Sequence, residues 1–121
     1  MPGKRIGLVV THSADHPEMA TLPFMLAGAA MAMAVEPVVI LQSEGVRLAV
    51  PGGAQAAAAE GLAPVADLMA AVLGGGHRIM VCASCLATRN IPEGSLVEGC
   101  YVGGAATVVE AMLECENFLR Y

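Results

Sequence analysis

Two cysteines stand three residues apart in the segment IMVCASCLATRN, residues 79 to 90. Cys82 closes a short apolar run, Cys85 follows about one helical turn later, and Arg89 comes four residues after Cys85. A thiol between a strand and a helix is favoured as thiolate, because the first N–H groups of the helix are free to face it. The spacing leaves three interpretations open: a reactive thiol pair, half of a metal site, or two small apolar side chains in a core.

A second polar position follows the first apolar run of the chain, where RIGLVV ends at Thr11 and His12. Ligands of open parallel sheets bind beyond the carboxyl ends of the strands. If these two strands are neighbours, His12 and Cys82 face the same crevice. We therefore take Cys82 and Cys85 as candidate catalytic residues, and His12 and Arg89 as candidate substrate-binding residues. A solvated loop position for His12 and a surface ion pair for Arg89 are the alternatives.

Metal and cofactor sites find little support in the sequence. One Cys-x-x-Cys supplies two of the four ligands of a zinc site, and no second pair with such spacing exists. Cys100 with His12 or His77 could complete a site only if the fold happened to bring them together. The glycine pairs lack a dinucleotide-binding or phosphate-loop pattern. We expect no metal and no cofactor, and we expect Cys100 and Cys115 to be packing residues.

The elements that position these residues follow from apolar periodicity and from helix-end signals. Asp15 is expected to cap a helix with Pro17 in its first turn, while Pro23 either kinks that helix or marks a second start after Thr21. Residues 22–35 are apolar on all sides of a helix and are expected to be buried on several of them. Strands are expected at 5–10, 37–42, 77–82, within 95–104, and at 117–121. Further helices are expected at 63–73, 84–90 and 105–113. A short helical or irregular segment is expected at 44–50 and a loop at 51–61.

Strands that alternate with helices predict an α/β fold of three layers: a mostly parallel five-stranded sheet with helices on both faces. No linker or internal repeat interrupts the chain, so residues 1–121 are expected to form a single domain. The pair Gly103-Gly104 is expected to permit a tight turn into the helix at 105–113, and Gly104→Val is expected to destabilise by on the order of 1–3 kcal/mol if φ at Gly104 is positive.

Composition excludes some partners and favours others. The net charge is −5 with only six Lys and Arg, which argues against a nucleic-acid surface. The longest apolar run has 14 residues, fewer than the ~20 of a membrane span, and no secretory signal is visible. Four cysteines are then best interpreted as cytoplasmic thiols. The chain is 56% hydrophobic and 14% charged, so we expect some apolar surface to meet another subunit.

The sequence resembles the DsrE/DsrF-like family of small α/β proteins, related in fold to flavodoxin, some of whose members relay sulfur in bacteria. The resemblance covers almost the whole chain, from THSADHPEMATLPFMLAGAAMAMAVEPVVIL to LVEGCYVGGAATVVEAMLECENFLRY. Its most specific part is a cysteine at a strand end with an arginine seven residues on, here Cys82 and Arg89. The resemblance implies a persulfide on Cys82 and a homo-oligomer, either a trimer or a hexamer. Cys85 is a thiol that sulfur-relaying members generally lack.

Three functions follow as hypotheses. The first is a sulfur-relay or thiol-redox protein, in which Cys82 exchanges sulfur with a donor or acceptor protein and Cys85 resolves the persulfide by forming a disulfide. The second is a non-catalytic oligomeric protein that binds a small ligand or a partner. The third is a metal-binding module.

Overall fold

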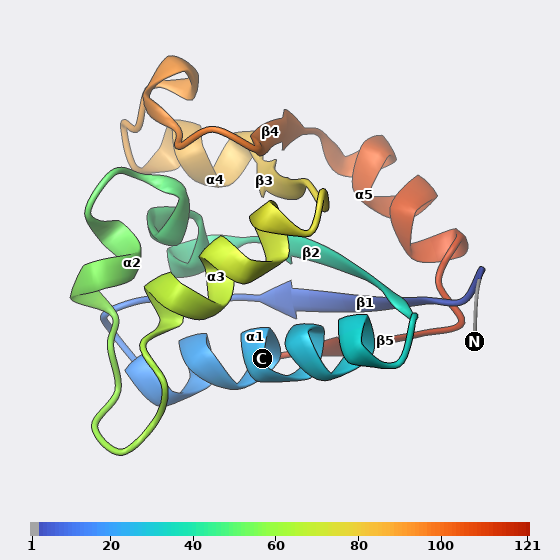
Figure 1. The fold of residues 1–121 in the computed structure, drawn as a ribbon. Helices are drawn as coiled ribbons and strands as arrows, with labels where there is room; N and C mark the ends of the chain where they lie inside the picture. Colours follow the sequence, from blue (N-terminus) through green and yellow to red (C-terminus); the bar gives the residue numbers. More distant parts are fainter. Residues whose placement is uncertain (1–2) are drawn as a thin grey trace.

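The computed structural model describes residues 3–121, and its strands form one five-stranded sheet in which every pairing is parallel (Figure 1). The order across the sheet is β4-β3-β2-β1-β5. The predicted α/β class is therefore confirmed, with a sheet that is wholly rather than mostly parallel. The strands are β1 (Arg5–Val10), β2 (Glu36–Leu41), β3 (Ile79–Cys82), β4 (Cys100–Gly103) and β5 (Asn117–Arg120).

Alternating side chains of the three central strands enter two separate apolar cores, one on each face of the sheet. The first core lies under α1 (Pro17–Ala32) and α3 (Val65–Gly74), which pack side by side (Figure 1). The second core lies under α5 (Ala105–Leu113) and includes Val108 of that helix. Helices thus cover both faces, as predicted. From the strands, the first core takes Leu8, Val10, Val39, Leu41, Ile79 and Val81, and the second takes Val9, Ile40 and Met80.

The start of α1 differs from the prediction. Pro17 is in the first turn as expected, but His16 precedes the helix as its cap residue, and no side chain bonds the free N–H groups. The Asp15 carboxylate instead accepts the Ser13 N–H and pairs with His12. The helix runs on through Pro23 to Ala32, so a second helix start after Thr21 is wrong.

The outer side of α1 is less buried than the sequence predicts. Phe24 and Ala27 are fully buried, whereas Met25 is 41% exposed and Met33, just past the helix end, is 55% exposed. Because α3 and the sheet cover only one side of α1, an apolar side is left on the surface of the single chain. The prediction of burial on several sides is therefore wrong for the chain on its own.

The remaining connections are short helices. A 3-10 helix, Ser43–Ala49, follows β2 as predicted, and α4 (Ala83–Thr88) follows β3 directly. The expected loop at 51–61 contains one helical turn, α2 (Gly53–Ala56), and a second 3-10 turn spans Glu93–Ser95. Among residues 3–121, no helix combines the length and the apolar character needed to cross a bilayer.

The two glycines before α5 differ in the space around them. Gly104 has φ −90°, which any residue adopts, and a Cβ there would meet nothing within 4 Å. The condition for a destabilising Gly104→Val, a positive φ, is therefore not met. Gly103 is the constrained residue, because a Cβ there would lie 2.7 Å from Sδ of buried Met80 and 3.3 Å from Cβ of Thr107.

Gly103→Ala is expected to lower the free energy of unfolding by about 1–3 kcal/mol, since the methyl group forces Met80 out of its packed position. Gly104→Ala is the matched control and is expected to change it by less than about 0.5 kcal/mol. Urea denaturation of both variants measures the difference. Equal stability of the two variants would contradict the packing argument.

Candidate functional site

Cys82 lies at the carboxyl edge of the sheet. It is the last residue of β3 and the cap residue of α4, so its side chain leaves the sheet where the chain turns into the helix. The thiol is half-buried and its Sγ lies 3.4 Å from Ser84 Oγ. The predicted position of Cys82 between a strand and a helix is therefore present, although α4 has only six residues.

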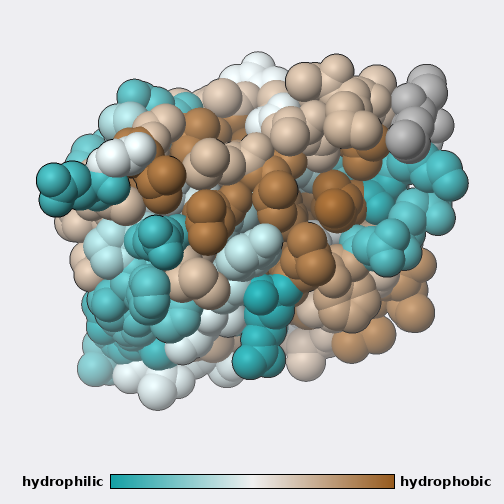
Figure 2. Space-filling model, turned by 90° about the horizontal axis from the view of Figure 1, so that it is seen from below, coloured by the Kyte–Doolittle hydropathy of each residue, from teal (hydrophilic) through white to brown (hydrophobic). Residues whose placement is uncertain are grey.

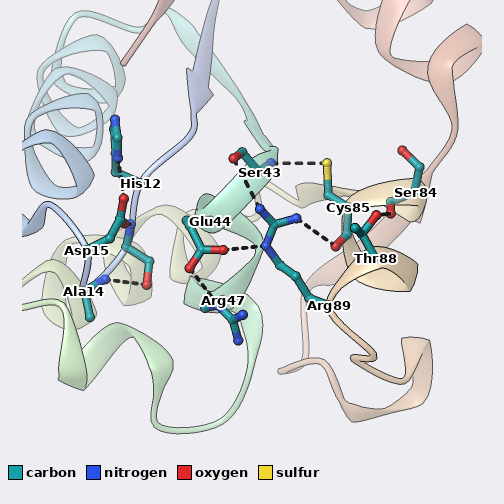
Figure 3. A network of polar contacts seen from close by, with 11 residues as sticks. His12, Ala14, Asp15, Ser43, Glu44, Arg47, Ser84, Cys85, Thr88 and Arg89 are labelled. Atoms are coloured by element: carbon teal, nitrogen blue, oxygen red, sulfur yellow. Dashed lines mark hydrogen bonds and ion pairs between the residues drawn. The ribbon is translucent and has the colours of Figure 1, made fainter.

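Cys85 lies within α4, one turn after Cys82, and its sulfur is fixed by a neighbouring segment. Ser43 follows Gln42 just beyond the end of β2. Its backbone N–H donates to Cys85 Sγ at 3.2 Å (Figure 3). Both thiols are free and half-buried. The two cysteines thus share one site, and each sulfur has its own hydrogen-bond partner.

The two thiols differ in acidity because their surroundings differ. Burial alone raises the pKa of Cys82, but the Ser84 hydroxyl, the Cys85 thiol and the backbone N–H groups of both residues lower it by more, so the net pKa lies below its ordinary value. Burial also raises the pKa of Cys85. The Ser43 N–H and the Arg89 charge lower it, yet the adjacent Cys82 raises it again, and its net pKa is raised. Cys82 is therefore the better thiolate of the pair.

Arg89 contacts the same site through Cys85 and the segment after β2. Its Nε donates to Glu44 Oε2 at 2.5 Å, Nη1 to the Cys85 carbonyl at 3.2 Å, and Nη2 to Ser43 Oγ at 3.4 Å (Figure 3). Arg47 Nε donates to the other Glu44 oxygen at 2.8 Å. Hydrogen bonds from Arg89 and Arg47 hold the pKa of Glu44 below its ordinary value, so this carboxylate is charged at neutral pH.

Ser43 and Glu44 are site residues that the sequence analysis missed. They follow β2, and β2 is the neighbour of β3 in the sheet. A usable signal was present, since polar residues directly after an apolar run also marked His12. Ser43 has φ +52°, an uncommon conformation for a residue with a side chain.

His12 lies apart from the thiols, because β2 separates β1 from β3 and the two strands are not neighbours. The expectation of a shared crevice depended on that neighbourhood. His12 Nδ1 instead pairs with Asp15 Oδ2 at 2.7 Å, and its ring lies 5.3 Å from that of His16. Figure 3 shows this pair on one side and Cys85 on the other, with the segment that follows β2 between them. Of the four predicted site residues, the fold brings together Cys82, Cys85 and Arg89.

The other two cysteines lie elsewhere. Cys100 packs beside the first core, and burial raises its pKa to about 11. Cys115 donates to the Ala111 carbonyl at 3.3 Å, and burial is the main cause that raises its pKa. Within the described part of the chain, residues 3–121, no group of three or more His, Cys, Asp or Glu side chains could hold a metal ion.

Comparison with known proteins gives a consistent family and fold. The model of the DsrE/DsrF-like family matches residues 4–121. Uncharacterized protein MJ0760 of Methanocaldococcus jannaschii is 30% identical over 100 residues, which are 83% of this chain and 36% of that protein. The chain therefore spans about a third of the length of this relative.

Two solved structures have the same fold over nearly their whole length. The crystal structure of the ychN protein from E. coli superposes with a TM-score of 0.82 at 16% identity and covers 98% of this chain and 99% of that one. The protein of unknown function MTH1491 from Methanobacterium thermoautotrophicum gives a TM-score of 0.75 at 19% identity, with the same coverage. Identities this low show the fold alone.

The order of thiol reactivity tests the site directly. Alkylation follows the thiolate fraction, so a lowered pKa moves the pH midpoint of the Cys82 reaction below the ordinary ~8.5, and a raised pKa moves that of Cys85 above it. Limiting iodoacetamide at pH near 6.5 is expected to modify Cys82 first and Cys100 last, as measured by peptide mass mapping. Faster alkylation of Cys85, Cys100 or Cys115 would show that Cys82 is a packing residue.

Proposed function

The chain belongs to the DsrE/DsrF-like family, and on this premise we propose that it is a thiol protein that carries sulfane sulfur as a persulfide on Cys82. The observation that carries the proposal is the unequal pair of thiols at the carboxyl edge of the sheet. Cys82 has the lowered pKa and Cys85 the raised one, three residues apart. A sulfur carrier needs a thiolate as the accepting sulfur, and the lowered pKa of Cys82 favours this form.

Loading is a thiol exchange that needs no cofactor. The Cys82 thiolate attacks the terminal sulfur of a donor persulfide, R–S–SH, forming the new S–S bond of Cys82–S–SH and releasing R–S⁻. The Ser84 hydroxyl and the N–H groups of Ser84 and Cys85 stabilise the thiolate before the attack. The donor is a protein or small-molecule persulfide.

Two exits from the loaded state follow from the geometry. In the first, an acceptor thiolate attacks the outer sulfur of Cys82–S–SH and regenerates the Cys82 thiolate. In the second, the Cys85 thiolate attacks the inner sulfur, so that a Cys82–Cys85 disulfide forms and HS⁻ leaves. The raised pKa of Cys85 keeps this thiol protonated at neutral pH, so the second exit is slow there. The second exit becomes faster as the pH rises.

Free thiols are central to this role, and they bear on where the protein works. The proposed exchange starts from Cys82 and Cys85 as free thiols. A reducing compartment maintains such thiols. We therefore place the function in the cytoplasm.

The sulfur-carrier function is tested by intact-mass analysis after incubation with a persulfide donor. The wild-type protein is expected to gain about 32 Da, the mass of one sulfur atom. Cys82→Ser is expected to abolish the adduct, because the accepting thiolate is gone. Cys85→Ser is expected to load but to release little sulfide, because the internal disulfide cannot form.

Cys100→Ser and Cys115→Ser are the controls for this experiment and are expected to load like the wild type. Loading that survives Cys82→Ser would contradict the role of Cys82. A wild-type protein that takes up no sulfur and shows no fast-reacting thiol would favour the alternative function, a non-catalytic protein that binds a small ligand or a partner.

We further propose that the protein works as a homo-oligomer, a trimer or a hexamer. Apolar side chains gather in a band on the side of the molecule formed by α1 in Figure 1, seen from below in Figure 2. Elsewhere, Leu113 is 81% exposed and Phe118 is 53% exposed, and every residue of β5 is exposed. With 14% charged residues, a free monomer would solvate this surface poorly.

Light scattering at micromolar concentration is expected to give about three or six times the chain mass of 12.3 kDa. Met25→Glu and Phe118→Glu place a charge on α1 and on β5 respectively, and the variant that lowers the mass identifies the contact face. A wild-type mass equal to that of one chain would contradict the oligomer.

A further inference from the structure

The sulfur of Cys85 is held by a backbone group in an uncommon conformation. Ser43 has φ +52°, which costs free energy in a residue with a Cβ and persists only where the surroundings fix it. This conformation aims the Ser43 N–H at Cys85 Sγ, at 3.2 Å. Other contacts must therefore hold Ser43 in this conformation.

Arg89 supplies the restraint, through one planar guanidinium that reaches three groups. It binds the Glu44 carboxylate, the Ser43 hydroxyl and the Cys85 carbonyl, and so joins the segment after β2 to α4 (Figure 3). The Arg89 side chain is only 20% exposed, which limits the competition of water for these bonds. The fork shape of the group matters here, because an ammonium could not reach three partners in a plane.

The backbone next to Ser43 is restrained by a close contact with the end of β1. A Cβ at Gly45 would lie 2.1 Å from the carbonyl oxygen of Val10, so the backbone after Glu44 is packed directly on the end of β1. Ser43 is thus held on one side by the close approach at Gly45 and on the other by Arg89. We refer to Ser43, Glu44 and Arg89 as the Cys85 bracket.

We propose that Arg89 and Glu44 are positioning residues that keep the Ser43 N–H on the Cys85 sulfur, where it stabilises the negative charge that Cys85 receives when a Cys82–Cys85 disulfide is opened. The inference rests on the proposed function, in which this disulfide forms during sulfide release. Arg89 acts through geometry more than through charge, because Glu44 neutralises it within the same contact.

The chemical consequence concerns the reduction of this disulfide. When a thiolate R–S⁻ from a reducing dithiol attacks Cys82 Sγ, a mixed disulfide R–S–S–Cys82 forms and the electron pair of the broken S–S bond leaves on Cys85 as thiolate. The Ser43 N–H stabilises that leaving thiolate and so lowers the barrier to attack at Cys82. The second thiol of the reductant then releases Cys82 as thiolate, ready for loading.

The test measures the pH midpoint of Cys85 alkylation by iodoacetamide in a Cys82→Ser background, by peptide mass mapping. Arg89→Met is expected to move the midpoint upward and to slow alkylation at pH 7 about tenfold, the effect of losing one hydrogen bond to a charged group. Arg89→Lys is expected to do nearly the same, because it keeps the charge but loses the fork. Arg47→Met is the matched control and is expected to leave the midpoint unchanged, since Arg47 binds Glu44 without contacting Ser43 or Cys85.

Glu44→Ala separates positioning from charge by the sign of its effect. It removes a negative charge near Cys85 and frees Arg89, so a purely electrostatic role predicts a lower midpoint. The bracket predicts a higher one, because Ser43 is no longer held. A lower midpoint in Glu44→Ala, or a wild-type midpoint in Arg89→Lys, would overturn the proposal.

Melting temperatures of all variants show whether each one folds, and Glu44→Ala carries the test if the Arg89 variants do not. No persulfide enters the experiment, so its outcome is independent of sulfur loading. If the variants raise the pH midpoint of Cys85 alkylation but the wild type takes up no sulfur, the bracket is retained and the sulfur-carrier function is rejected. If the wild type takes up sulfur but the variants leave the midpoint unchanged, the sulfur-carrier function is retained and the bracket is rejected.

Discussion

The adjacency of β2 and β3 in a parallel sheet is the constraint on which the site depends. Their register pairs Leu41 with Val81, so the chain leaves both strands at the same level and on the same edge. Ser43 and Cys85 therefore meet although 42 positions separate them in the sequence. The central position of β2 also explains why His12, at the end of β1, belongs to a different part of this edge.

Hydrogen bonds rather than formal charges distinguish the two thiols. Arg89 is the cation of the site, and its interaction with Glu44 leaves little net charge for either sulfur. Cys82 gains its acidity from the hydroxyl and N–H groups of the turn into α4, and Cys85 loses acidity through burial and its proximity to Cys82. The six-residue length of α4 limits the contribution of a helix dipole to this acidity. Local donors are thus the larger cause.

Local signals in the sequence predicted most of the elements, because periodicity and glycine positions act within one segment. The helix at 105–113 was predicted to the residue, and Cys82 was placed correctly at a strand end. Asp15 failed as a cap because its carboxylate is used by His12 and Ser13, a competition that spacing alone does not show. The polar residues after the second apolar run could have marked Ser43 and Glu44 as candidates. Their proximity to Cys85 depends on strand order, which is decided by packing between segments distant in sequence.

The unequal helix cover of the sheet has a consequence for how the molecule opens. The core under α1 and α3 takes residues from many elements. The core under α5 has only Val9, Ile40, Met80 and Val108 as buried members among residues 3–121. Less apolar burial means a smaller free energy for local detachment. In the single chain, α5 and the exposed β5 should therefore fray as one unit while the remaining strands stay folded. Amide hydrogens of these two elements would exchange with solvent well before those of β2, at the centre of the sheet.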